Sequence, residues 1–158
     1  MILMRKVSLF KLLLFFVVPV VLSGCWLDDN QSDSNTMNVA GTWRAPVRVT
    51  NCTPADVCSQ VGFEQGNSFN AVMNLHQNGS DVDGTYTYEG TNISADVSGK
   101  ISGTQLRLTG DVQHPFGRAT VDFVGSVSNS VINATVSHNV SLFDGRNGTV
   151  GGSGDFTR

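Results

Sequence analysis

The sequence has few of the residues on which catalysis and metal binding usually depend. It contains only three histidines, His76, His114 and His138, and no two of them are spaced as in the metal-binding pattern His-x-x-x-His. It also lacks a Gly-x-Ser-x-Gly nucleophile elbow and a phosphate-binding loop. We therefore expect a protein that is not an enzyme and that has no metal site and no cofactor.

The sequence has no apolar run of the length that a transmembrane helix needs. Its longest uninterrupted apolar stretch, Leu12–Leu22, spans 11 residues, whereas a membrane-spanning helix needs roughly 20. Basic residues precede this stretch and small residues follow it, which is the layout of a secretory signal peptide. An uncleaved membrane anchor is the alternative interpretation.

The residues Leu22-Ser23-Gly24-Cys25, at the end of the apolar stretch, resemble the lipobox of bacterial lipoproteins. In that class the cysteine sulfur is acylated with chains such as palmitate, and the bond before the cysteine is cut. The resemblance implies that residues 1–24 are a signal peptide and that Cys25 attaches the protein to a membrane, because two or more acyl chains anchor stably. We expect a lipid-anchored protein of the bacterial cell envelope, on the outer membrane and facing the periplasm.

The mature chain that this cleavage leaves is acidic. Of the 10 Lys and Arg residues three lie before Cys25, so 7 remain against 13 Asp and Glu. Nucleic acids and anionic lipids are bound mainly through Lys and Arg, and we therefore expect no nucleic-acid partner. Residues 25–38 are mostly polar and lack periodicity, which is typical of a disordered tether, and residues 39–158 have the length of one domain.

Strand-like alternation dominates residues 39–158, where helix-forming Glu and Lys are scarce and no helical pattern is evident. Asn78-Gly79 is a strong hairpin signal, and further turn signals recur every 8–15 residues. Eight strands are expected. Closing them into an antiparallel up-and-down barrel would remove both exposed edges, and a β-sandwich is the alternative. Glycines within the strands support strong bending; they are Gly84, Gly99, Gly110, Gly125, Gly152 and Gly154.

The first expected strand carries Gly41-Thr42-Trp43, and the sequence ends in Phe156-Thr157-Arg158. This arrangement resembles the calycins, which include lipocalins, fatty-acid-binding proteins and avidins. The resemblance implies that Gly41 and Trp43 lie at the closed end of a lipocalin-like barrel and that Arg158 packs across the Trp43 ring, as a cation–π contact allows. Trp43 is the only tryptophan of the expected barrel, so an avidin-type biotin site is not expected.

With Cys25 assigned to the lipid, Cys52 and Cys58 are left as an even pair. In an oxidising compartment we expect a disulfide between them. A redox pair or half of a metal site are the alternatives, although redox motifs usually place their cysteines two residues apart.

Two functions from different classes fit such a barrel. The first is binding of a small hydrophobic ligand, with an aromatic wall and His138 as a polar contact; the wall residues are Phe69, Tyr86, Tyr88 and Phe123. These five residues could equally fill the core. The second is a protein-interaction module, such as a protease inhibitor or an envelope assembly factor, that uses the Cys52–Cys58 loop and residues 61–64 for recognition. An open barrel cavity would favour the ligand, and a filled interior would favour the protein partner.

Overall fold

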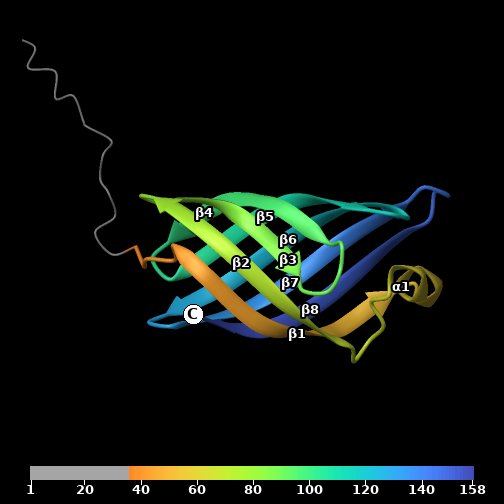
Figure 1. Ribbon diagram of the computed structural model, residues 1–158, viewed down its shortest axis with the longest axis horizontal. Coiled ribbons are helices and arrows are strands. Elements are labelled where there is room, and N and C mark those ends of the chain that lie inside the picture. The colour runs from red at the N-terminus through yellow and green to blue at the C-terminus, as the bar shows by residue number, and fades with distance from the viewer. Residues whose placement is uncertain (1–35) are drawn as a thin grey trace, which may run out of the picture. The chain divides into compact units, whose positions relative to one another are not determined.

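The computed structural model describes residues 36–158, so the expected signal peptide, Cys25 and most of the expected tether lie outside the described residues. Eight strands and one short helix make up this part of the chain (Figure 1). They are β1 (Gly41–Thr53), α1 (Ala55–Val61), β2 (Ser68–Asn78), β3 (Asp81–Tyr88), β4 (Ser94–Ser102), β5 (Gln105–His114), β6 (Gly117–Ser128), β7 (Val131–Leu142) and β8 (Asn147–Thr157).

The strands form a closed antiparallel barrel in which each strand pairs with its neighbour in the chain and β1 pairs with β8. This confirms the expected up-and-down barrel and excludes the sandwich. The closing pair places Arg44 opposite Thr157 and Arg48 opposite Ser153. Within the described residues no helix is long and apolar enough to span a membrane.

Alternation along each strand separates the barrel interior from the solvent. In β1 the side chains of Trp43, Ala45 and Val47 are buried, whereas those of Arg44 and Pro46 between them are exposed. Most of the other strands repeat this pattern, although β2 buries three residues in succession, Ala71–Met73. The inward side chains of the strands join those of α1 in a single hydrophobic core. Because strand side chains alternate between the two faces, the sequence pattern predicts most of the residues that fill the barrel.

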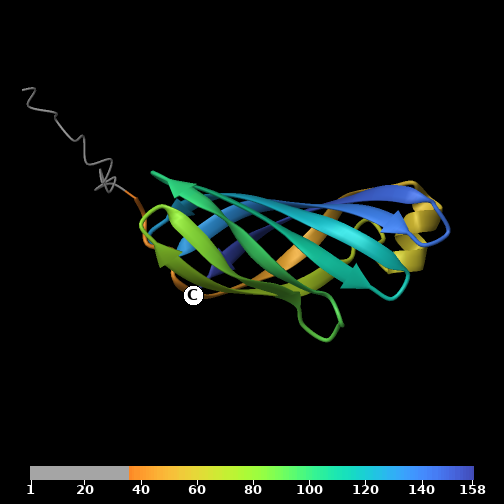
Figure 2. The same cartoon turned by 90° about the horizontal axis from the view of Figure 1, so that it is seen from above.

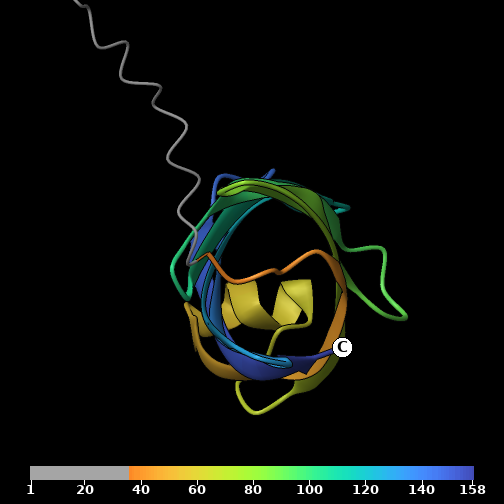
Figure 3. The ribbon, with the colours of Figure 1, turned by 90° about the vertical axis from the view of Figure 1, so that its left-hand side faces the viewer.

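The barrel has two different ends (Figures 1 and 2). The described chain starts and finishes at one of them, here called the terminal end, together with the turns that follow β2, β4 and β6. The opposite end, here called the helix end, carries α1 and the turns that follow β3, β5 and β7. Seen along the barrel axis, α1 lies across the bore (Figure 3).

Trp43 closes the terminal end. Its side chain is fully buried, and its indole Nε1 donates a hydrogen bond of 2.8 Å to the backbone oxygen of Val39. The guanidinium of Arg158 lies 4.6 Å from the centre of the Trp43 ring, which confirms the expected contact. Met37 already donates a backbone hydrogen bond of 3.1 Å to Gly103, so ordered contacts begin before residue 39.

The helix α1 was not expected from the sequence. It has only seven residues, too few for a helical period to stand out, and it ends at Gly62, whose φ of 77° favours glycine. Val57 and Val61 are spaced i, i+4 and both are buried, so the helix is stabilised mainly by packing on the barrel.

Glycine at position 99 allows β4 and β5 to lie close together. A Cβ atom built there would overlap the backbone carbonyl oxygen of Arg107 on the neighbouring strand. The overlap is with backbone, so no side-chain rotation can relieve it.

We expect Gly99→Ala to lower the free energy of unfolding by about 1–3 kcal/mol, because the β4–β5 ladder must move apart. Urea denaturation followed by circular dichroism measures this change. Ser98→Ala, at the exposed neighbouring position, is the matched control and should change stability by less than about 0.5 kcal/mol. Equal stability of the two variants would contradict this account of the close approach.

Candidate binding site at the helix end

The segment between β1 and β2 covers the helix end of the barrel. Val57, Val61 and Phe63 from this segment are all buried against the barrel. A disulfide between Cys52 and Cys58, with an S–S distance of 2.02 Å, confirms the expected pairing and ties the middle of α1 to the end of β1. The cover is therefore covalently fixed at one side.

Replacing both cysteines by serine should lower the free energy of unfolding by about 2 kcal/mol, since the disulfide closes a short loop whose entropy is otherwise gained on unfolding. Thermal unfolding of the double variant and of the native protein, with and without reductant, measures this effect. Reductant should lower the midpoint of the native protein alone. If the double variant also responded to reductant, the effect would not come from this disulfide.

Arg146, in the turn after β7, holds the other side of α1. Its guanidinium contacts Asp56 at 2.6 Å and Asp144 at 2.7 Å and also hydrogen-bonds Gln60. Hydrogen bonds from Arg146 lower the pKa of the Asp56 and Asp144 carboxyls. These groups are solvent-exposed, where single ion pairs contribute little, so their main effect is to set the position of α1 relative to the β7–β8 turn.

The ring of Phe63 lies among three rings from the barrel wall. Its centroid is 4.7 Å from that of Phe69, 5.5 Å from that of Tyr88 and 5.8 Å from that of His138. The Phe63 and His138 rings are nearly parallel, at 26°. We call Phe69, Tyr88 and His138 the aromatic box, because together they enclose a space of the size of one aromatic ring.

Tyr88 and His138 also form a polar pair inside the barrel. The Tyr88 hydroxyl lies 3.1 Å from Nε2 of His138, within hydrogen-bond distance. Burial lowers the pKa of His138 to about 4, against a smaller opposing effect of the Asp122 charge, and burial raises the pKa of Tyr88 to about 12. Both groups are therefore neutral at pH 7, and the phenol can donate to the imidazole.

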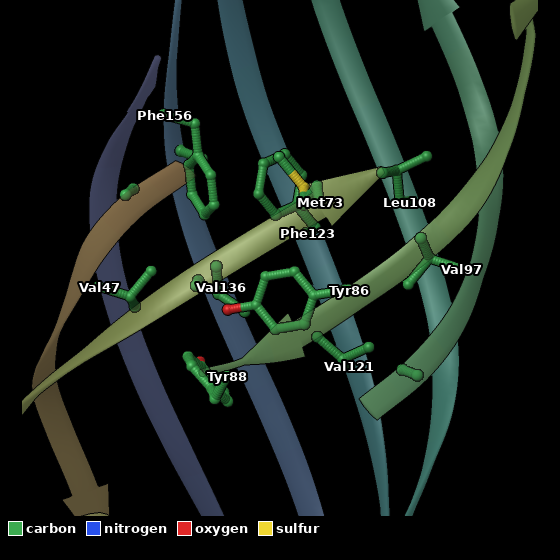
Figure 4. Packing of buried hydrophobic residues seen from close by; sticks show 14 of the residues in the cluster. Val47, Met73, Tyr86, Tyr88, Val97, Leu108, Val121, Phe123, Val136 and Phe156 are labelled. Atoms are coloured by element: carbon green, nitrogen blue, oxygen red, sulfur yellow. The ribbon is translucent and has the colours of Figure 1, made fainter. Parts of the chain in front are cut away.

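The hydroxyl of Tyr86 has no hydrogen-bond partner in the part of the chain that the structure describes, although the side chain is only 1% exposed. It points across the barrel interior, with Tyr88 below it in Figure 4. Burial, with a smaller effect of the neighbouring Tyr88 phenol, raises the pKa of Tyr86 well above its usual value. Leaving a buried hydroxyl unpaired costs about 1–3 kcal/mol, so phenylalanine would be more stable at this position.

The barrel interior is filled by side chains rather than open. Large buried residues occupy it, among them Trp43. Figure 4 shows three more of them, Met73, Phe123 and Phe156. A small, partly open cavity of about 20 Å³ lies at the helix end beside Phe63 and His138, with room for about one water molecule. A surface groove of about 280 Å³ adjoins it, and Phe63 lines both the cavity and the groove.

Two phenylalanines are exposed at the rim of the helix end. Phe116 is 47% exposed and Phe143 is 74% exposed, and these are the large hydrophobic residues that the described chain leaves in solvent. The backbone N–H of Phe143 donates a 3.0 Å hydrogen bond to the carbonyl oxygen of Phe116, which joins the β5–β6 and β7–β8 turns. Phe116 also lines the groove.

The five residues expected to bind a ligand fall into two groups. Phe69, Tyr86, Tyr88 and His138 lie together at the helix end, linked by ring contacts of 5.2–6.3 Å. Phe123 lies apart and packs edge-to-face on Phe156 at 5.4 Å. It is a core residue that does not share the site.

Sequence reasoning missed Phe116, Phe143 and Arg146. Phe116 had a signal, because an aromatic residue between Pro115 and Gly117 in a turn cannot be buried within a strand. Arg146 had no signal, since its partners in α1 are some 90 positions away in the sequence.

No group of His, Cys, Asp and Glu side chains within residues 36–158 is placed to hold a metal ion. Comparison of the sequence and structure with protein-family models, with curated proteins and with solved structures found no match.

Proposed function

We propose that this protein is a lipoprotein, anchored to a membrane of the bacterial cell envelope through acylated Cys25, and that it is a non-enzymatic interaction module for an envelope protein. The helix end of the barrel is the docking surface. The observation that supports this function best is that the barrel interior is filled, while the large exposed hydrophobic residues of residues 36–158, Phe116 and Phe143, lie at the rim of the helix end.

The helix end has the properties of a preformed docking surface. Phe116 and Phe143 present exposed aromatic rings, and aromatic residues are enriched in the centres of protein interfaces. The disulfide and the Arg146 contacts fix α1 beside them. A surface that is already ordered loses less entropy on binding.

The end at which the described chain enters the barrel also supports the helix end as the docking surface. The described chain enters the barrel at the terminal end, where Met37 and Val39 make their first contacts. The helix end, which carries Phe116 and Phe143, is therefore the end of the barrel opposite to the point where the described chain begins.

The docking surface is tested by a photo-crosslinking amino acid placed at position 116 or 143 in intact cells, with position 129 in the β6–β7 turn as a control at the opposite end. Positions 116 and 143 should give an adduct with the same envelope protein, and position 129 should not. The double variant Phe116→Ser, Phe143→Ser should weaken binding of that protein by roughly 30-fold or more. Identical adducts from all three positions, or none from positions 116 and 143, would remove the support for this surface.

The anchor is tested separately. Cys25→Ser should incorporate no labelled palmitate and should leave the membrane fraction, whereas Cys52→Ser should remain acylated. Equal acylation of the Cys25→Ser variant would rule out the lipoprotein assignment.

Binding of a small hydrophobic ligand is the second candidate function. It is favoured by one specific observation: Phe63, from the connection between α1 and β2, fills the aromatic box, and the buried Tyr86 hydroxyl behind the box has no partner within residues 36–158. Mass spectrometry of the protein under native conditions, purified from its own host, tests this function. A ligand-free mass in every preparation would count against a tightly bound natural ligand.

A further inference from the structure

We propose that the aromatic box binds one aromatic ring of a small neutral ligand, that a hydrogen-bond acceptor on this ligand reaches the Tyr86 hydroxyl, and that Phe63 occupies the ring position in the ligand-free protein. This inference rests on the second candidate function, and its site adjoins the docking surface at the groove that Phe116 lines. It identifies the site, the chemical class of the ligand and the residue that competes with it.

The four rings of the box and its occupant come from two kinds of segment. Phe69, Tyr88 and His138 come from strands β2, β3 and β7 of the barrel wall, and their positions are fixed by the sheet. Phe63 comes instead from the connection between α1 and β2. It is thus the one ring of this cluster that can leave without disturbing a strand.

Phe63 has open space beside it into which its side chain can rotate. The residue lines both the small cavity and the surface groove. The backbone N–H of Phe63 is held by a 3.0 Å hydrogen bond to Cys58, so we expect rotation of the side chain rather than movement of the loop. Rotation into the groove would join the groove, the cavity and the vacated ring position into one site.

The polar group behind the box is the Tyr86 hydroxyl. Tyr88 and His138 satisfy each other, whereas the Tyr86 hydroxyl has no partner in the described part of the chain. The Tyr86 ring lies against two members of the box, at 5.2 Å from Tyr88 and 6.3 Å from His138. A buried donor without a partner needs an explanation in a native structure, and a ligand acceptor bound behind the box supplies one.

The surroundings of the box favour a neutral ligand. Apart from the tyrosines, His138 is the one polar or charged residue among the buried residues of the described chain, and a neutral imidazole cannot neutralise an anion. Burying an unpaired carboxylate there would be strongly unfavourable. A neutral carbonyl, ester or ether oxygen is the acceptor that this site fits.

The test uses two fluorinated probes of nearly equal shape, 4-fluoroacetophenone and 4-fluoro-α-methylstyrene, and only the first carries a hydrogen-bond acceptor. Binding to the purified protein is measured by fluorine NMR. Phe63→Ala should bind the ketone roughly tenfold or more tightly than the native protein, because the competing ring is gone. It should also prefer the ketone over the styrene by up to roughly tenfold, as expected for one hydrogen bond.

Tyr86→Phe, in the native and in the Phe63→Ala background, is the decisive variant. It should abolish the preference for the ketone while raising the thermal midpoint, because an unpaired hydroxyl is removed from the core. A purely structural tyrosine would not give this combination. Tyr86→Phe in otherwise native protein also keeps the test available if Phe63→Ala does not fold.

The proposal is overturned if neither probe binds any folded variant up to its solubility limit, or if Tyr86→Phe leaves the preference for the ketone unchanged. Both results come from purified protein without a protein partner, and every variant keeps Phe116 and Phe143. Failure of this inference is therefore distinguishable from failure of the docking surface.

Discussion

Trp43→Ala is expected to lower the free energy of unfolding by about 3–5 kcal/mol, the range found for removal of a large buried aromatic side chain. The substitution leaves a cavity at the terminal end and removes the hydrogen bond from the indole to Val39. Since small domains are stable by only about 5–15 kcal/mol, this loss is a large part of the total. Equilibrium urea unfolding measures it.

Two further variants separate the effects of the indole hydrogen bond and of the Arg158 contact on the stability that Trp43 provides. Trp43→Phe keeps most of the apolar volume but loses the indole hydrogen bond, and it should be less destabilising than the alanine variant. Arg158→Met removes the cation–π contact but keeps an unbranched side chain, and it should cost only about 1 kcal/mol. If Arg158→Met were as damaging as Trp43→Ala, the closure of this end would depend on Arg158 rather than on tryptophan burial.

Acid should destabilise the barrel through His138 at a pH above that at which most carboxylates titrate. Burial lowers the pKa of His138 in the folded protein from 6.5 to about 4. Between these values the unfolded chain binds a proton that the folded protein does not, so stability falls as the pH drops from 6.5 to 4. Above pH 6.5 the imidazole is neutral in both states, and below about pH 4 it is protonated in both.

Because each pKa unit corresponds to about 1.4 kcal/mol, the loss of stability across this range should be about 3 kcal/mol. Urea unfolding at several pH values between 4 and 7.5 measures it. His138→Gln should flatten the profile between pH 6.5 and 4, whereas His76→Gln, at an exposed strand position, should leave the slope in place. A native profile that is already flat in this range would show that His138 is protonated without cost in the folded state.

The fold could be predicted from the sequence because two simple patterns agree along the whole barrel. Alternation places Trp43, Val47 and their counterparts in the other strands on the inner face, and turn residues such as Asn78-Gly79 separate the strands. In this meander every strand pairs with its neighbours in the sequence, and β1–β8 is the one pairing between strands that are distant in the sequence. Local signals therefore specify almost the entire topology.

The candidate site was only partly predictable, because its arrangement depends on segments without regular periodicity. Parity shows that Tyr86, Tyr88 and His138 face inward, and the structure confirms that they meet. Strand alternation also predicts that Phe123 faces inward, but this side chain packs elsewhere in the core, against Phe156. Phe123 differs from Tyr86, Tyr88 and His138 in its height along the barrel axis. Strand register and stagger set this height, and alternation does not.

The closure of the sheet also has a consequence for how the protein acquires its structure. Seven of the eight strand pairings join consecutive strands, whereas the pairing of β1 with β8 joins the two ends of the domain. While a ribosome is still producing β8, an incomplete meander has unpaired backbone edges on β1 and on β7, and such edges promote aggregation. The interval before the last strand docks is therefore the stage at which a folding helper would protect this protein most.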